Sequence, residues 1–206
     1  LYIATDTISI SNPSGVCKKI ISQCEVFSSI NETYLINYSG KYSFINGKVQ
    51  EIRQMPQFAK FRRYYLFKEI TKFTNGSAYN VYIRYPYSDP LFLFLLSWLK
   101  ILGCKTIIEI PTYPYTKNHD SNLYSYIRLL TDKVFSVFLR FFVDRIVTYS
   151  DDKKIFGIQT INTINGVDFS RINLVNRRNK LYDVINLVGI AHLYSCHGYD
   201  RIIKGL

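Results

Sequence analysis

The chain has 206 residues, and its hydrophobic share of 48% and charged share of 20% are those of a folded protein rather than a disordered one. This length corresponds to one domain, or to one domain and part of a second. The formal net charge of +11 favours anionic partners such as nucleotides, nucleic acids, anionic sugars and the inner membrane surface. The most apolar run, Leu91–Leu99, is far shorter than the roughly 20 residues that span a bilayer, so it is predicted to be a buried helix.

The first helix is predicted at residues 15–27, between strands at residues 1–5 and 33–38. Its apolar residues recur every three or four positions, as on one face of a helix. The predicted apolar stripe consists of Val16, Ile20, Cys24 and Phe27. The residues expected to face water are Lys18, Lys19, Ser22 and Glu25. This pattern is typical of an amphipathic helix.

The cysteines do not follow the spacing of a zinc or disulfide framework, because no CxxC pair occurs among them. Cys17 and Cys24 lie seven residues apart, so on a helix they share a face and are expected to be packing residues. This usage favours a reduced, cytoplasmic setting.

A β-hairpin is predicted at residues 42–52, because Asn46-Gly47 between two apolar runs is the strongest short-range turn signal. Helix-like and strand-like segments then alternate. Further helices are predicted near residues 57–74, 89–102, 121–142 and 151–156, and further strands at residues 80–85, 105–110, 145–150 and 158–164. Such alternation predicts an α/β, Rossmann-like fold with a mainly parallel sheet, helices on both faces and the hairpin as an insertion.

Residues 1–170 are predicted to form this Rossmann-like domain, and residues 171–183, with the polar run "NRRNKLYD", to form a linker. Residues 184–206 contain one more buried strand and the start of a helix. Because a strand and one helix cannot bury a core of their own, we interpret residues 184–206 as the truncated start of a second domain.

The unusual loops of the chain all follow predicted strands: "NPSGV", "RYPYSDP", "PTYPYT", "YSDD" and "NGVD". Parallel strands bring such loops to the carboxyl edge of the sheet, where ligands of open α/β sheets bind. The candidate site is therefore expected at this edge.

Ser14 and Gly15 immediately precede a predicted helix, where free backbone N–H groups and the helix dipole favour an anion such as a phosphate. The pair does not form the GxGxxG fingerprint of dinucleotide-binding folds. A plain helix N-cap followed by a flexible glycine explains the same residues, and the sequence leaves both interpretations open.

Glu109 and Arg84 stand at the ends of neighbouring predicted strands. Glu109 either faces a substrate or accepts hydrogen bonds within a rigid turn. Arg84 either holds a carboxylate or phosphate through two parallel hydrogen bonds, or pairs with Glu109 as a structural bridge. Tyr113 and Tyr115 either stack on sugar rings or simply cover the edge of the sheet.

The histidines do not indicate a metal site. His119 is expected in a solvated loop, whereas His192 and His197 lie close together after the last predicted strand. Two histidines without a third ligand make a poor metal site, so no metal is predicted.

Five segments together resemble the retaining glycosyltransferases of family 4, which have the two-domain GT-B fold. The segments are "GVCKKIISQ", "YIRYPYSDP", "IIEIPTYPY", "TYSDDKKIFGIQTINTINGVD" and "VGIAHLYSCHGYDRIIKGL". Their order and spacing extend over nearly the whole chain. They look most like the bacterial branch that builds capsular and other surface polysaccharides.

The resemblance implies that the first domain binds the acceptor, a saccharide or lipid-linked saccharide, and that most of the nucleotide-sugar donor site lies in the second. It implies donor-phosphate contacts at Ser14, Gly15, His192 and His197. It implies a catalytic position for Glu109, where many relatives carry a histidine, and acceptor contacts at Arg84, Tyr113 and Tyr115. No cofactor or metal is implied, because helix dipoles and basic residues stabilise the leaving phosphate.

Two other classes of function remain as alternatives. A basic nucleic-acid-binding module would need its lysines and arginines on one face, but here they are spread over several helices and a linker. A module that binds the membrane surface without catalysis is suggested by the helix near residues 121–142, which mixes Arg128, Lys133 and Arg140 with many apolar residues. We therefore expect a cytoplasmic transferase, with no nucleic-acid partner, that associates peripherally with the inner face of the membrane.

Overall fold

The computed structural model describes residues 1–8, 14–55, 61–115, 123–164, 166 and 203–205. The chain divides into two units, residues 1–164 and 165–206. Every element discussed below belongs to the first unit. The linker predicted at residues 171–183 lies outside the described residues, as does most of the segment predicted at 184–206.

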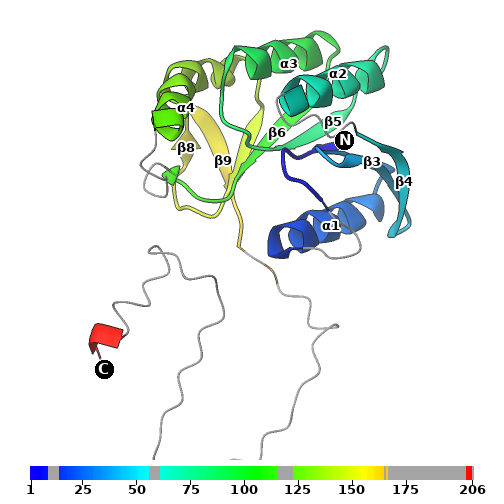
Figure 1. Cartoon of the computed structure of the whole chain (residues 1–206), viewed down its shortest axis with the longest axis horizontal. Helices are drawn as coiled ribbons and strands as arrows, with labels where there is room; N and C mark the ends of the chain where they lie inside the picture. The colour runs from blue at the N-terminus through cyan, green and yellow to red at the C-terminus, as the bar shows by residue number, and fades with distance from the viewer. Residues whose placement is uncertain (9–13, 56–60, 116–122, 165, 167–202, 206) are drawn as a thin grey trace, which may run out of the picture. The chain divides into compact units, whose positions relative to one another are not determined.

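The first unit is built on a sheet whose strands lie in the order β4-β3-β2-β1-β5-β6-β7-β9-β8 (Figure 1). The parallel strands are β1 (Tyr2–Ile3), β2 (Thr33–Ile36), β5 (Asn80–Arg84), β6 (Lys105–Ile110), β7 (Arg145–Thr148) and β9 (Ile158–Asn162). The antiparallel strands at the two edges are β3 (Gly40–Ile45), β4 (Lys48–Gln54) and β8 (Lys154–Ile155).

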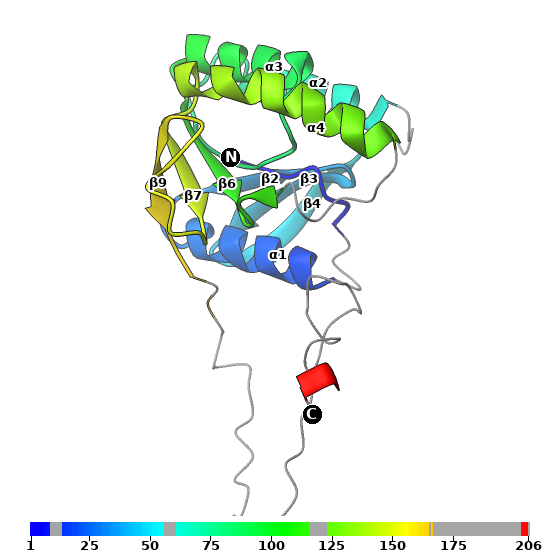
Figure 2. The same cartoon turned by 90° about the vertical axis from the view of Figure 1, so that its left-hand side faces the viewer.

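Helices cover both faces of this sheet. Helix α1 (Gly15–Ser28) packs on one face, whereas α2 (Arg62–Thr74), α3 (Pro90–Ile101) and α4 (Leu123–Phe135) lie on the other (Figure 2). The prediction of an α/β, Rossmann-like fold with a mainly parallel sheet is therefore confirmed. Among the helices that the structure describes, none combines the length and apolar character needed to cross a bilayer.

The two faces of the sheet have separate apolar cores, because side chains along a strand alternate between its faces. In β5, Val81 and Ile83 join the large core beneath α2 and α3, whereas Tyr82 packs against the smaller core beneath α1. Tyr2 of β1 belongs to that smaller core. This alternation decides on which face each candidate site residue lies.

The predicted hairpin is confirmed as β3 and β4. Its turn residues Asn46 and Gly47 have φ angles of 50° and 75°, the left-handed values that a two-residue type I′ turn requires. The helix predicted at residues 89–102 is also confirmed, as α3. Asp89 caps it by accepting a hydrogen bond from the Phe92 backbone N–H, and Pro90 occupies the first helical position.

One predicted helix was wrong, and another changes type before its end. The short helix predicted at residues 151–156 is instead strand β8, joined to β9 by a turn in which Phe156 and Gly157 have φ angles of 53° and 80°. Two consecutive left-handed residues make a hairpin, and Gly157 is the signal that the sequence analysis missed. The helix predicted at residues 121–142 ends at Phe135, and a 3-10 helix, η3 (Ser136–Phe141), continues from it.

The predicted faces of α1 also need correction. The buried line consists of Cys17, Ile20, Cys24 and Ser28, and Val16 is 40% exposed. The prediction that Cys17 and Cys24 are packing residues on one face is confirmed. Lys19 does not face water, as had been expected, but turns toward the sheet and contacts Glu109.

Candidate functional site

The loops after β1, β2, β5 and β7 all lie at the carboxyl edge of the sheet, since these strands run parallel. Two groups of charged and aromatic residues gather there. One lies on the face covered by α1, and the other on the face covered by α2 and α4. We describe them as the Glu109 cluster (Tyr2, Asp6, Lys19, Arg84, Glu109 and Tyr149) and the arginine cavity, whose lining residues are given below.

Glu109 is the centre of the first group and is fully buried. Its Oε1 accepts hydrogen bonds from Lys19 Nζ at 2.8 Å and from the Tyr149 hydroxyl at 3.0 Å. Its Oε2 accepts one from the Tyr2 hydroxyl at 3.2 Å. The carboxylate thus joins helix α1 to β1, β6 and the end of β7.

Arg84 lies directly beside Glu109, since the two residues pair in the register of β5 and β6. Arg84 Nη1 is 3.8 Å from Glu109 Oε1, and Arg84 Nε is 3.2 Å from Asp6 Oδ2. The structural bridge that the sequence suggested between Arg84 and Glu109 is therefore present as an ion pair. Two cations and two carboxylates make this cluster neutral.

These contacts set the ionisation of the cluster. Burial by itself would raise the pKa of Glu109, but the hydrogen bond and charge of Lys19, with the charge of Arg84, outweigh burial and lower it below 4.5. Burial, with the nearby Glu109 charge, raises the pKa of Tyr2 and of Tyr82. The side chains therefore favour an ionised glutamate surrounded by neutral phenols.

Lys19 is the partly open member of the cluster, with 28% of its side chain exposed. Besides Glu109 it hydrogen-bonds the Tyr149 hydroxyl, and its ammonium lies 4.2 Å from the centre of the Tyr149 ring. Its position is one helical turn after Gly15. Lys19 is a site residue that the sequence analysis missed, because its helical position predicted a solvated side chain.

Ser14 and Gly15 form the N-terminus of α1. The Ser14 hydroxyl accepts a hydrogen bond from the Cys17 backbone N–H at 3.3 Å, so Ser14 is a helix N-cap. Among the described residues, and apart from the chain next to Gly15 and the backbone of α1 itself, no atom lies within 4 Å of the position that a Cβ on Gly15 would take. This end of the helix is thus both capped and sterically open.

Tyr113 and Tyr115 lie on the opposite face from Glu109 and Arg84. Both pack against the core beneath α2 and α3, and the Tyr115 hydroxyl donates to Asp132 of α4. Asp132 is only 2% exposed and also accepts from the Tyr85 hydroxyl and, at 2.5 Å, from the Ser88 backbone N–H. The sheet therefore separates the predicted tyrosines from the predicted glutamate and arginine.

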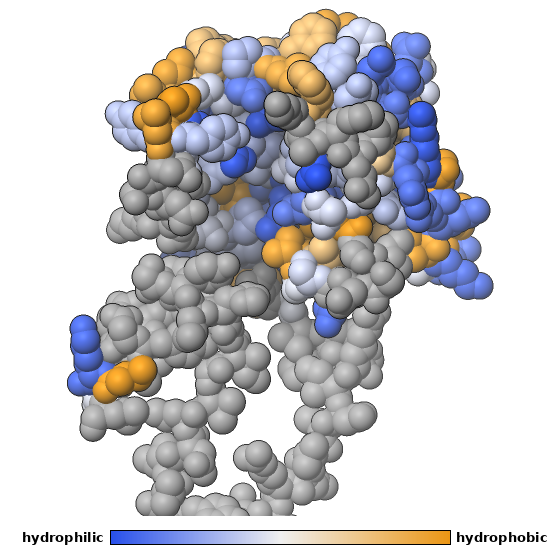
Figure 3. Space-filling model, in the orientation of Figure 1, coloured by the Kyte–Doolittle hydropathy of each residue, from blue (hydrophilic) through white to orange (hydrophobic). Residues whose placement is uncertain are grey.

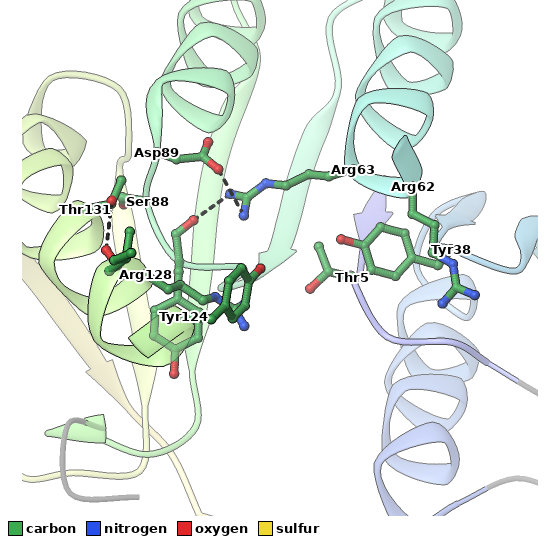
Figure 4. A pocket seen from close by; sticks show the side chains of 11 residues that line it. Thr5, Tyr38, Arg62, Arg63, Ser88, Asp89, Tyr124, Arg128 and Thr131 are labelled. Carbon is green, nitrogen blue, oxygen red and sulfur yellow. Dashed lines mark hydrogen bonds and ion pairs between the residues drawn. The ribbon is translucent and has the colours of Figure 1, made fainter. Parts of the chain in front are cut away.

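The arginine cavity has a volume of about 520 Å³. It opens beyond the ends of β1, β2 and β5, and among the described residues none of the site residues predicted from sequence lines it. Its lining residues are Thr5, Tyr38, Arg62, Arg63, Tyr87, Ser88, Asp89, Tyr124, Ile127, Arg128 and Thr131. Figure 4 shows Arg128 and Tyr124 on one side of it, and Thr5, Tyr38 and Arg62 on the other.

Arg63 is held rigidly in this cavity. Its Nη1 lies 3.1 Å from Asp89 Oδ2 and 3.2 Å from the Pro86 carbonyl oxygen, and its Nη2 donates to the Tyr87 carbonyl at 2.7 Å. Burial lowers the Arg63 pKa, although the Asp89 charge opposes this. Arg128 lies with its guanidinium 4.2 Å from the centre of the Tyr87 ring.

A sequence signal for this cavity exists. Arg62 and Arg63 occupy the first turn of α2, where the positive end of the helix dipole disfavours cations. Such a placement costs stability unless an anion compensates it, so "RR" at the start of a helix is a ligand signal. Arg128 offers no comparable signal, because it lies within an apolar helical pattern.

His119, His192 and His197 lie outside the described residues, as does Asp168 at the end of the "NGVD" loop. Within the part of the chain that the structure describes, no group of three or more His, Cys, Asp or Glu side chains is arranged to hold a metal ion.

Comparison of this chain with protein-family models, curated proteins and solved structures finds no match. The assignment of function therefore depends on the residues and the geometry described above.

Proposed function

We propose that this chain is the acceptor-binding part of a cytoplasmic glycosyltransferase in surface polysaccharide synthesis. The enzyme would transfer a sugar from a nucleotide-sugar donor to a saccharide or lipid-linked saccharide acceptor. Support comes from the Rossmann-like fold together with the sequence resemblance to family 4 glycosyltransferases. The single observation that carries the proposal is a substrate-sized cavity at the carboxyl edge of the parallel sheet.

The acceptor is proposed to bind in the arginine cavity. Its volume of about 520 Å³ accommodates a sugar residue, and Tyr38 and Tyr124 offer aromatic faces and hydroxyl groups to a sugar ring. Tyr115 contacts Tyr87 edge-on, with ring centres 5.3 Å apart, and so supports the cavity from behind. Tyr113 packs against Tyr115 in turn.

The donor phosphates are proposed to approach the N-terminus of α1. The open space at Gly15 and the N–H groups of the first helical turn favour a phosphate there. Lys19 supplies a positive charge one turn further along, and Glu109 holds that charge in place through its 2.8 Å hydrogen bond. In this scheme Glu109 is a positioning residue. Phosphate contacts at His192 and His197 stay a prediction from the sequence resemblance, since both residues lie outside the described residues.

The proposal is tested by NMR titration of the chain with neutral saccharides and with nucleoside diphosphates and their sugar conjugates. We expect saccharides to shift the signals of cavity residues, and nucleotides to bind with a dissociation constant of about 1 mM, since most donor contacts are expected in the second domain. Tyr38→Ala should weaken saccharide binding, and Tyr64→Ala, a change at an exposed tyrosine of α2, should not. Micromolar nucleotide binding without saccharide binding would contradict the division of roles.

Attachment to a membrane surface is a second candidate function, and helix α4 favours it. The residue at the centre of its inner face is Asp132, whereas its outer face carries an apolar stripe: Leu123, Tyr126, Ile127, Leu130 and Val134. Leu130 and Val134 are each 52% exposed. The exposed charges of α4 and η3, from Arg128, Lys133 and Arg140, are all positive, which suits an anionic bilayer. Figure 3 shows apolar residues at the upper left, where Figure 1 places α4, and along the top, with hydrophilic residues between them.

Sedimentation with lipid vesicles tests this second function. We expect the chain to bind anionic vesicles, and binding to weaken with salt. The double change Leu130→Gln with Val134→Gln should reduce binding at least about tenfold, because two apolar side chains no longer enter the interface. The matched control, Val26→Gln with Ile30→Gln, alters two exposed apolar residues at the end of α1. Equal partitioning onto neutral and anionic vesicles would contradict the membrane function.

A further inference from the structure

Three arginines from two helices converge on one cavity. Arg62 and Arg63 come from the first turn of α2, and Arg128 comes from the second turn of α4. All three lie close enough to the Tyr38 hydroxyl for their charges to lower its pKa, although burial is the larger effect and raises it. From this convergence we infer that the cavity binds a phosphate group.

The charges that line the cavity are not balanced within the described residues. Three guanidinium groups face a single carboxylate, that of Asp89, so the lining has a net charge of +2. Asp89 is already engaged by Arg63 at 3.1 Å and by the Phe92 backbone N–H at 2.8 Å. A phosphate monoester or a pyrophosphate diester, each carrying about two negative charges at neutral pH, matches the excess charge. A ligand with only one carboxylate would leave half of this excess positive charge unbalanced.

The three guanidinium groups differ in how many donors remain free. The N–H donors of Arg63 are largely occupied by Asp89 and two backbone carbonyl groups. The buried Nε of Arg63 has no hydrogen-bond partner among the described residues. Arg128 stacks on Tyr87 and makes one weak hydrogen bond, of 3.4 Å, to the Pro86 carbonyl. Arg62 has no ion pair within the described residues. Arg63 therefore shapes the cavity, and Arg62 and Arg128 are the residues that grip the phosphate.

The N-terminus of α2 adds a second source of donors. Its N-cap, Phe61, provides no side-chain acceptor for the N–H groups of the first turn. A phosphate oxygen at this end would receive these N–H groups and favourable interaction with the helix dipole. It would also compensate Arg62, a cation that the dipole disfavours and that, unlike Arg63, has no ion pair within the described residues. One ligand thus serves both the N–H groups of this first turn and the arginines.

The identity of the phosphate follows from the proposed function and rests on it. If the cavity holds the acceptor, the acceptor carries a phosphate next to its sugar, as in a sugar phosphate or a sugar linked through phosphate to a lipid. Phosphate binding itself does not depend on glycosyl transfer, and a free inorganic phosphate would offer the same oxygens. The two sources are separated by experiment.

The test is calorimetric titration of the chain with inorganic phosphate, inorganic pyrophosphate and glucose 1-phosphate. We expect pyrophosphate to bind, and the double variant Arg62→Gln with Arg128→Gln to reduce its affinity at least about thirtyfold. The matched control is Arg53→Gln with Lys72→Gln, which removes the same net charge from two exposed residues paired with Glu69. The control should keep its affinity within about threefold, since long-range charge effects are screened. Thermal unfolding of each variant verifies that it is folded.

Equal weakening by both double variants would overturn the inference, because it would indicate attraction to net charge alone. Absence of phosphate and pyrophosphate binding at millimolar concentration would also overturn it. The acceptor assignment is supported if glucose 1-phosphate binds at least about tenfold more tightly than either phosphate or glucose does. It is rejected if glucose 1-phosphate and phosphate bind with equal affinity. If the chain binds saccharides but not phosphate, the transferase proposal stands and the phosphate inference is refuted. If it binds phosphate but not saccharides, the phosphate inference stands and the transferase proposal is refuted.

Discussion

The Glu109 cluster and the arginine cavity lie at the same edge of the same sheet, but they use charge in opposite ways. In the cluster, Lys19 and Arg84 are matched by Glu109 and Asp6, and the glutamate is fully buried. In the cavity, three arginines face one carboxylate around an open space of about 520 Å³. Matched charges inside a protein hold elements together, whereas unmatched charges around a space are available to a ligand. The comparison predicts that a change at the buried Glu109 mainly affects stability and that changes at the cavity arginines mainly affect binding in the cavity.

The largest expected effect is that of Glu109→Gln on stability. The substitution leaves the Lys19 and Arg84 charges without their shared carboxylate in a largely buried place, so the free energy of unfolding should fall by about 3 kcal/mol. Urea unfolding followed by circular dichroism measures it. The control Glu51→Gln changes an exposed glutamate of β4 and should stay within about 0.5 kcal/mol of the parent. Equal effects of the two changes would mean that the cluster is not a stabilising bridge.

Asp132 is a buried hydrogen-bond acceptor behind the wall of the arginine cavity. Its substitution should lower the free energy of unfolding by less than Glu109→Gln does. Asp132→Asn replaces the charged acceptor of Tyr85, Ser88 and Tyr115 by a neutral amide of the same shape. Hydrogen bonds to a charged group are stronger than neutral ones, so we expect a loss of about 2 kcal/mol. Urea unfolding measures it, and Asp151→Asn at an exposed position is the control. An unchanged stability would show that the charge of Asp132 is not needed.

The change of stability with pH should be smaller than the effects of these two substitutions, and it should come from the Glu109 cluster. Because the pKa of Glu109 is lower in the folded chain than its ordinary value of 4.5, the unfolded chain binds the proton more readily. The stabilisation is therefore fully present above the ordinary pKa of 4.5 and is lost as the pH falls through the lower, folded pKa. Urea midpoints between pH 7 and about pH 3 measure the loss. In Glu109→Gln this part of the pH dependence should be absent, and its persistence there would assign it to other groups.

The smallest expected effect on stability is that of Arg128→Gln in the cavity. Arg128 stacks on Tyr87 and makes a single long hydrogen bond, so the free energy of unfolding should change by no more than about 0.5 kcal/mol. Pyrophosphate affinity should nevertheless fall. A stability loss as large as that of Glu109→Gln would place Arg128 among the structural residues and remove the contrast between the two regions.

Local sequence signals determined the elements of this chain. Asn46-Gly47 specified the hairpin, and Asp89-Pro90 specified the start of α3, because turns and helix caps depend on a few neighbouring residues. Alternating strands and helices were enough to predict a parallel α/β sheet and the edge at which its loops gather. The hairpin at Phe156-Gly157 was missed, since the acids before it resemble a helix start.

Only the tertiary structure decided which residues meet. Arg84 and Glu109 point to the face covered by α1, whereas the turn after β6 carries Tyr113 and Tyr115 to the opposite face, so the predicted site divides across the sheet. Arg62 and Arg128 line the same cavity although they are far apart in sequence. Periodicity predicts which face of a helix is apolar, but not what lies opposite a given side chain. Lys19 meets a buried glutamate, and the apolar stripe of α4 faces outward, because packing between distant elements decides both.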